Sequence, residues 1–222
     1  MTSVFLQVRL DSSRLPRKAL ERLGDLTVTE RCFEALDGVE ADQRILVTEP
    51  SSVTELEPLA RRAGWKTFTG SKNDVLDRFV RAARATGTTT IIRATGDNPL
   101  VSADLANRLL RLHRQTGADY SGFTGAPVGS GVEIVAVGAL ERAWTSFPDE
   151  YEREHVSPYL YRRPEVFRIH RPTVDAEYLW PGRITIDTQD DLDYLRSAWA
   201  EVYQGHPPTL EEVIPWLKRH PR

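Results

Sequence analysis

Apolar and polar positions come in alternating blocks through the first half of the chain, and these blocks predict strands and helices in turn. Four short runs rich in apolar or β-branched residues are typical of buried strands, at 4–8, 45–47, 66–69 and 89–94. Between them, apolar residues recur at helical spacing over 28–36, 52–63, 73–85 and 102–116. This alternation predicts an α/β fold with three layers, α/β/α, around a mostly parallel sheet.

Residues at the predicted helix ends support these boundaries. Gly38 and Gly64 follow two of the helices, where glycine commonly ends a helix. Ser102, and either Asn73 or Asp74, suit the N-cap positions of two others.

The second half of the chain has a less regular pattern. Alternation predicts short strands at 133–137, 167–171 and 183–186. Helical spacing predicts helices at 139–144, 152–161, 189–203 and 210–219. No internal repeat or linker interrupts the chain, so we expect one domain over 1–222, with a less regular region at about 125–180.

Composition and charge narrow the class of protein. Hydrophobic residues make up 40% of the 222 residues, as in globular proteins, and the net charge of −3 argues against a nucleic-acid partner. The single cysteine, Cys32, excludes an intrachain disulfide and lies in an amphipathic segment, which predicts a buried structural thiol. The start, MTSVFLQVRL, is charged too early for a signal peptide, and no apolar run approaches the roughly 20 residues that cross a membrane. We therefore expect a cytoplasmic protein without a membrane partner.

A cationic loop directly follows the first predicted strand. Residues 9–18 include Arg9, Arg14, Arg17 and Lys18, with two serines among them. Arginine forks, a lysine point charge and accessible backbone amides suit phosphate oxygens, although a solvated basic loop would have the same composition. The loop is not a Walker A motif, and no GxGxxG follows the strand. The loop is therefore a candidate anion site at the carboxyl edge of the sheet, where such sheets bind ligands, with a solvated loop as the alternative.

Two aspartates also follow predicted strands. Asp97 comes after 89–94 and precedes Asn98, and Asp187 directly follows the run 183–186. Mg²⁺ binds few protein carboxylates and completes its shell with water and phosphate oxygens, so this pair suits a metal–triphosphate site. The alternative is that each aspartate only caps a turn or the next helix.

Five motifs, in this order, resemble those of the spore-coat polysaccharide F-type cytidylyltransferases, relatives of the enzymes that make CMP-Kdo and CMP-sialic acid. They are QVRLDSSRLPRK, GSKNDVLDRF, RATGDNPLV, EREHVSPY and ITIDTQDDL, and they span nearly the whole chain. The resemblance implies a GT-A-like (nucleotide-diphospho-sugar transferase) fold and a homodimer. It also implies a Mg²⁺-dependent enzyme that transfers CMP from CTP to a sugar-acid, sugar-phosphate or phosphonate acceptor and releases pyrophosphate.

The resemblance also implies roles for individual residues. The catalytic residues would be Arg14, Lys18 and Asp97. Those lining the nucleotide site would be Leu6, Gln7, Arg9, Ser13, Arg14, Lys18, Gly70, Ser71, Asp74, Thr95 and Asp97. The small anionic acceptor would contact Asn98, Glu133, Glu154 and His155, and the metal would bind Asp97 and Asp187.

The chain departs from the family pattern at two positions of the first loop. Arg17 stands where the family usually has glycine, and an arginine would be strained there if the turn needs a positive φ. Asp11 would repel a triphosphate unless Arg9 or Arg14 pairs with it. These departures leave open a non-catalytic nucleotide-binding module.

A second alternative is a glycosyltransferase on the same fold, which would consume a nucleotide-sugar. Residues 190–193 resemble its DxD motif, although aspartates also suit the first turn of the helix predicted at 189–203. No residue by itself proves that the base is cytosine, and the sequence does not name the acceptor.

Overall fold

The computed structural model describes residues 1–222, which fold around a sheet of seven strands in the order β5-β4-β1-β6-β8-β7-β9. Four neighbouring strands are parallel: β5 (Lys66–Thr69), β4 (Gln43–Thr48), β1 (Thr2–Gln7) and β6 (Thr90–Thr95). Strand β8 (Glu133–Ala136) is antiparallel to both β6 and β7 (Tyr120–Gly122), while the edge strand β9 (Ile169–His170) is parallel to β7. The prediction of a mostly parallel sheet is confirmed.

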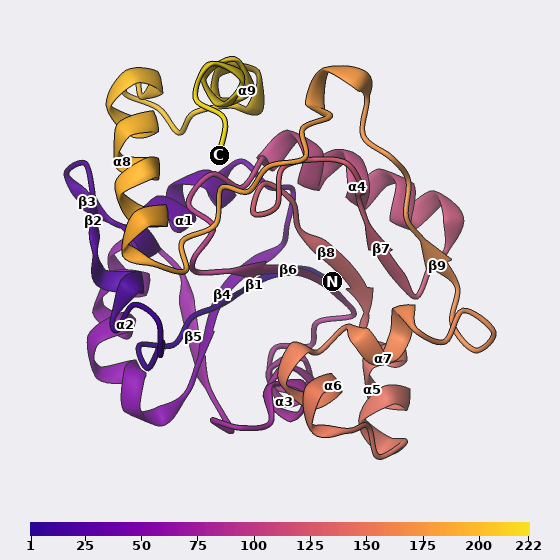
Figure 1. The fold of residues 1–222 in the computed structure, drawn as a ribbon. Coiled ribbons are helices and arrows are strands. Elements are labelled where there is room, and N and C mark those ends of the chain that lie inside the picture. Colours follow the sequence, from indigo (N-terminus) through magenta and orange to yellow (C-terminus); the bar gives the residue numbers. More distant parts are fainter.

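Helices cover both faces of the sheet, which confirms the three predicted layers (Figure 1). The larger core lies under α1 (Val28–Asp37), α2 (Pro50–Arg62), α4 (Ala103–Thr116), α8 (Gln189–Val202) and α9 (Leu210–Arg219). The smaller core lies on the other face, under α3 (Val75–Thr86), α5 (Val137–Thr145), α6 (Glu150–His155) and α7 (Pro158–Tyr161). Two short 3-10 turns, η1 (Lys18–Leu20) and η2 (Ala176–Tyr178), complete the connections.

The alternation of side chains along β1 explains why this strand lies at the centre of the sheet. Val4 and Leu6 pack into the larger core, and Phe5, between them, packs into the smaller one. Successive residues of a strand point to opposite faces, so a continuous apolar run fills both cores at once. None of the helices combines the length and the apolar character that crossing a membrane requires.

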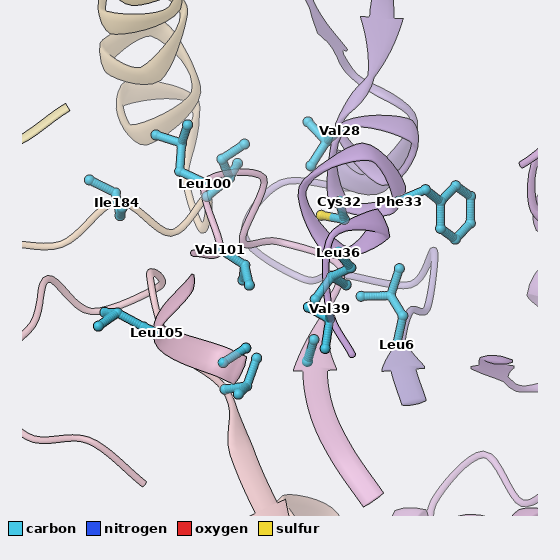
Figure 2. Packing of buried hydrophobic residues seen from close by; sticks show 14 of the residues in the cluster. Leu6, Val28, Cys32, Phe33, Leu36, Val39, Leu100, Val101, Leu105 and Ile184 are labelled. Carbon is cyan, nitrogen blue, oxygen red and sulfur yellow. The ribbon is translucent and has the colours of Figure 1, made fainter. Parts of the chain in front are cut away.

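The predicted caps and the buried thiol are confirmed. The side chains of Ser102 and Asp74 accept backbone N–H bonds at the starts of α4 and α3, so the second cap is Asp74 rather than Asn73. Figure 2 shows Cys32 on α1 between Val28 and Leu36. The Cys32 side chain is fully buried, and burial raises the pKa of its thiol far above the usual range.

Three predicted elements of the second half are wrong in extent or type. The segment 183–186 is extended but forms only an isolated bridge, because its amides bond to loops, from Ile184 to the Val128 carbonyl and from Ile186 to the Asp97 carbonyl. The helix predicted at 152–161 is two short helices, broken at Val156, where φ is 71°. The strand predicted at 167–171 shrinks to β9.

The pattern also missed three short strands. One is β7, a three-residue strand that ends in Gly122. The others are β2 (Arg22–Leu23) and β3 (Leu26–Thr27), which form a two-stranded hairpin outside the main sheet. Strands of two or three residues are too short to show a period.

Candidate active site

A cavity of about 300 Å³ opens at the carboxyl edge of the parallel strands. Gln7 at the end of β1 pairs in register with Thr95 at the end of β6, so the loops that follow these strands meet there. The cavity brings together ten residues predicted for the site, namely Gln7, Arg9, Ser13, Arg14, Lys18, Thr95, Asp97, Glu154, His155 and Asp187. The lining is mainly charged and polar, as an anionic, hydrated ligand requires.

Lys18 lies between the two predicted metal-binding aspartates. Its Nζ donates to Asp97 Oδ2 at 2.8 Å and to Asp187 Oδ1 at 3.0 Å. A third bond, of 2.6 Å, goes to the carbonyl of Ile186. The Lys18 side chain is only 13% exposed, so this ammonium group is held firmly among three oxygen atoms. One cation therefore already bridges both carboxylates.

Further cations surround Asp187. Arg14 Nη2 lies 2.8 Å from Asp187 Oδ1, and Arg183 pairs with Asp187 Oδ2. Burial raises the pKa of the Asp187 carboxyl, but the hydrogen bond and charge of Lys18, with Arg183 and Arg14, outweigh it and leave the pKa below its usual value. Asp187 is thus held as an anion at the cavity wall.

Neither aspartate caps a helix, so that part of the alternative interpretation is wrong. Thr188 is the N-cap of α8, and Asp191 completes its capping box while also accepting from the Asp187 amide. Ser102 caps α4, which leaves Asp97 Oδ1 to accept a 2.6 Å bond from the Thr95 hydroxyl. Asp190 and Asp191 lie in the first turn of α8, as the sequence suggested for the DxD-like run, and Asp193 lies in the second turn.

A second cavity, of about 440 Å³, adjoins the first. The two cavities share Arg93 and Thr95 in their walls. Two predicted acceptor contacts, Asn98 and Glu133, line the second cavity and not the first. A ligand in each cavity would therefore meet its neighbour beside Arg93 and Thr95.

Arg93 is a site residue that the residue-by-residue prediction missed. It faces Glu133 across the β6–β8 pair, and its Nη1 lies 2.5 Å from Glu133 Oε2. Its Nη2 donates to Gln7 Oε1 at 3.1 Å. Glu133 is held in turn by the hydroxyls of Tyr120 and Ser157. An arginine inside a strand of apolar and β-branched residues is the signal that could have indicated this role.

The family to which the chain belongs follows from comparison with known proteins. The cytidylyltransferase family matches residues 4–208, which include every side chain of both cavity walls named above. The chain belongs to the cytidylyltransferase family.

Individual relatives agree with this assignment. The cytidylyltransferase is 30% identical over 226 residues to the spore coat polysaccharide biosynthesis protein SpsF of Bacillus subtilis, covering 98% of this chain and 94% of the relative. A solved cytidylyltransferase structure from Leptospira borgpetersenii serovar Hardjo-bovis has a TM-score of 0.91 at 26% identity, covering 99% of this chain and 94% of that one. The CMP:2-keto-3-deoxy-manno-octonic acid synthetase complexed with CTP shares the fold, with a TM-score of 0.71 at 16% identity, over 90% of this chain and 98% of that one. The resemblance seen in the motifs is confirmed.

The cationic loop 9–18 accommodates both departures from the family pattern. Arg17 has φ of 60° and ψ of 22°, the left-handed conformation that glycine adopts without strain. The Arg17 guanidinium points away from the cavity, and its Nη1 donates to Glu55 of α2 at 2.9 Å. Arg17 therefore does not line the cavity. Asp11 lies 2.8 Å from Lys72 Nζ and 3.6 Å from Arg9 Nε, and the Lys72 hydrogen bond lowers the pKa of its carboxyl. The negative charge of Asp11 is therefore already compensated by Lys72.

Four residues predicted for the nucleotide site do not line the first cavity of the cytidylyltransferase. Leu6 is fully buried in the larger core, because its side chain points away from the sheet edge. Gly70, Ser71 and Asp74 form the loop between β5 and α3. Ser71 Oγ accepts the Asp74 amide, and Asp74 caps α3 and contacts Arg153 at 2.5 Å.

Proposed function

We propose that the protein transfers CMP from CTP to a small anionic acceptor and releases pyrophosphate. The observation that carries the proposal is the cation held between two carboxylates, Lys18 between Asp97 and Asp187, on the wall of a polar cavity. The family match and the CTP complex of a synthetase with the same fold support this choice of reaction and nucleotide.

The carboxylate pair fits Mg²⁺. One oxygen of Asp97 and one of Asp187 lie within 3.0 Å of a single cationic atom, and Mg²⁺ binds through one or two carboxylates plus waters and phosphate oxygens. Asp97 and Asp187 would hold the ion, which would polarise the phosphates and neutralise charge that develops on them.

The cationic side chains would bind the triphosphate of the nucleotide. Lys18 and Arg14, which neutralise the carboxylates in the free protein, would turn to the triphosphate when the metal takes their place. An acceptor oxygen then attacks the α-phosphorus. The bond between the α-phosphorus and the oxygen that links it to the β-phosphorus breaks, and pyrophosphate leaves with that oxygen. Phosphoryl-type transfer depends on positioning and charge stabilisation, and both cations would stabilise the departing pyrophosphate.

The second cavity is the proposed acceptor site. Its wall holds two arginines, Arg93 and Arg171, which suit a carboxylate, phosphate or phosphonate group. Asn98 Oδ1 is buried there without a partner and can accept a bond from a sugar hydroxyl. Glu133 is engaged by three side chains and so acts by positioning Arg93. Glu154 and His155 line the first cavity, and we propose them as acceptor contacts at its rim.

We also propose a homodimer. Five of the six large hydrophobic side chains that are exposed lie within 125–180, namely Val128, Phe147, Tyr151, Val166 and Leu179. Burying such surface is the main favourable term in association. Light scattering is expected to give about twice the chain mass of 25.1 kDa, and a mass equal to one chain would contradict the proposal. A cytoplasmic location stays a prediction.

The first experiment is a thermal-shift panel with CTP, UTP, GTP and ATP, each with and without Mg²⁺. A ligand at about one hundred times its Kd stabilises the fold by about 2.7 kcal/mol, which raises Tm measurably. We expect a Mg²⁺-dependent rise that is largest with CTP, and pyrophosphate release can then be screened over acidic acceptors. A flat response to all four nucleotides would contradict the proposed function. Nucleotide binding without product from any acceptor would favour the non-catalytic alternative, whereas turnover of a nucleotide-sugar without pyrophosphate release would favour a glycosyltransferase.

A further inference from the structure

Arg78, on α3, is a buried cation with no assigned role. Its side chain is fully buried, and its stem fills the space beside Gly70, where a Cβ would lie 2.8 Å from Arg78 Cγ. Only Nη1 is engaged, through a 2.8 Å bond to the carbonyl of Ser71. Nε and Nη2 are buried and have no hydrogen-bond partner. Native proteins rarely leave charged donors in this state, so a ligand that completes the pair is the natural explanation.

The free atoms form one geometrical unit. Nε–H and the adjacent Nη2–H point in parallel from the same side of a guanidinium group, and together they bind two neighbouring acceptors. Arginine has no acceptor and stays protonated under ordinary conditions. Burial lowers the pKa of Arg78 to about 10, which still leaves the side chain charged at neutral pH. This pair of donors, Nε–H and Nη2–H of Arg78, is called the Arg78 fork below. The fork recognises a pair of acceptors and rejects a donor.

Arg78 lies at the edge of the sheet that carries the nucleotide cavity. The charged groups near enough to act on the pKa of Arg78 are Glu49, Arg9 and Asp11, which follow β4 and β1. Arg9 itself lines the first cavity. The loop from β5 to α3 lies along the lower edge of Figure 1. It contacts Arg78 Nη1 through the Ser71 carbonyl and is tied to Asp11 of the loop after β1 through Lys72.

We propose that Arg78 reads the base of the nucleotide by donating Nε–H and Nη2–H to O2 and N3 of cytosine. Cytosine presents two neighbouring acceptors at these atoms, whereas uracil, a ring of the same size, has a donor at N3. The base reaches the fork when Lys72 releases Asp11 and the loop 71–73 moves aside. That ion pair is half exposed at Lys72, and exposed pairs contribute little stability, so this contact opposes the movement only weakly. This inference rests on the proposed function.

The test measures nucleotide binding, which needs no acceptor. Isothermal titration in Mg²⁺ compares CTP, UTP and 3-deaza-CTP, in which a C–H replaces N3. The unmodified protein is expected to bind CTP about 10- to 100-fold more tightly than either of the others, the usual discrimination of a bidentate contact. In Arg78→Met, which keeps the apolar stem, the three affinities are expected to fall within about threefold of one another, because the fork that distinguishes them is gone.

A structural role would give a different result. If Arg78 only supports the loop, the substitution weakens all three nucleotides alike and the CTP preference survives, which overturns the inference. Arg81→Met, one turn along the exposed face of α3, is the matched control and should keep the preference. Should Arg78→Met not fold, Arg78→Lys keeps the charge and lacks the fork. Equal binding of CTP and 3-deaza-CTP by the unmodified protein overturns the inference without any variant, and absence of CTP binding overturns the proposed function itself.

Discussion

Replacing Asp97 with asparagine is expected to lower kcat by at least about a thousandfold, equivalent to roughly 4 kcal/mol of transition-state stabilisation. The amide keeps the shape of the carboxylate and its contact with Thr95, but it removes one of the two charges proposed to hold Mg²⁺. The Mg²⁺-dependent part of the CTP thermal shift should vanish together with turnover. Pyrophosphate release is the measurement, with an acceptor that supports turnover of the unmodified protein.

Asp193→Asn is the matched control for this substitution. Asp193 lies on α8 and contacts Arg196 at 3.1 Å, outside both cavities. Its loss is expected to change kcat by less than about twofold, as surface substitutions usually do. Unchanged pyrophosphate release in Asp97→Asn would refute the metal assignment. A large loss in Asp193→Asn would instead favour the DxD interpretation and a glycosyltransferase.

Lys18→Met is expected to separate catalysis from metal binding. Removing a cation that stabilises transition-state charge typically lowers kcat about 100- to 1000-fold. In the free protein, however, Lys18 occupies the position between Asp97 and Asp187 that the metal needs. Without this ammonium group, Mg²⁺ alone should stabilise the variant more than the unmodified protein. Thermal shift in Mg²⁺ without nucleotide measures this effect, and pyrophosphate release measures the loss of turnover.

Arg17→Met provides the comparison within the same loop. It also removes one cation, but Arg17 is paired with Glu55 and points away from the cavity. Its kcat is expected to stay within about threefold of the unmodified value, because an exposed ion pair contributes little. If Lys18→Met gained no Mg²⁺ response, or if both variants lost turnover equally, Lys18 would not be the specific cation of the site.

The first half of the fold could be predicted because its elements are long and regular. Apolar runs such as 4–8 and the helical period of 73–85 are visible in the sequence, and capping by Asp74 and Ser102 marks where helices begin. The second half could not be predicted as well, because its elements are short. The segment 183–186 has the apolar alternation of a strand, but its amides bond to loops. Val156 breaks a helix with a positive φ, a conformation that a valine in the sequence does not predict.

The site, too, could be predicted only in part from the sequence. Arg14, Lys18 and Asp97 could be chosen from residue type and from their positions after strands, since parallel strands end at one edge. Asp187 follows a segment that is not a strand, and it reaches the same edge because the Ile186 amide bonds to the Asp97 carbonyl. That Arg17 faces Glu55, and that Asp11 is neutralised by Lys72, could not be predicted, because both pairings join segments far apart in sequence.

The sequence by itself determined the α/β class, the order of strands and helices in the first half, the family and the main charged residues, because each of these depends on local pattern. Only the tertiary structure decided which charges meet. It set Lys18 between two aspartates, joined Arg93 to Glu133, and left the Arg78 fork without a partner. These are long-range contacts, and chain folding, rather than any local preference, brings their atoms within hydrogen-bond distance.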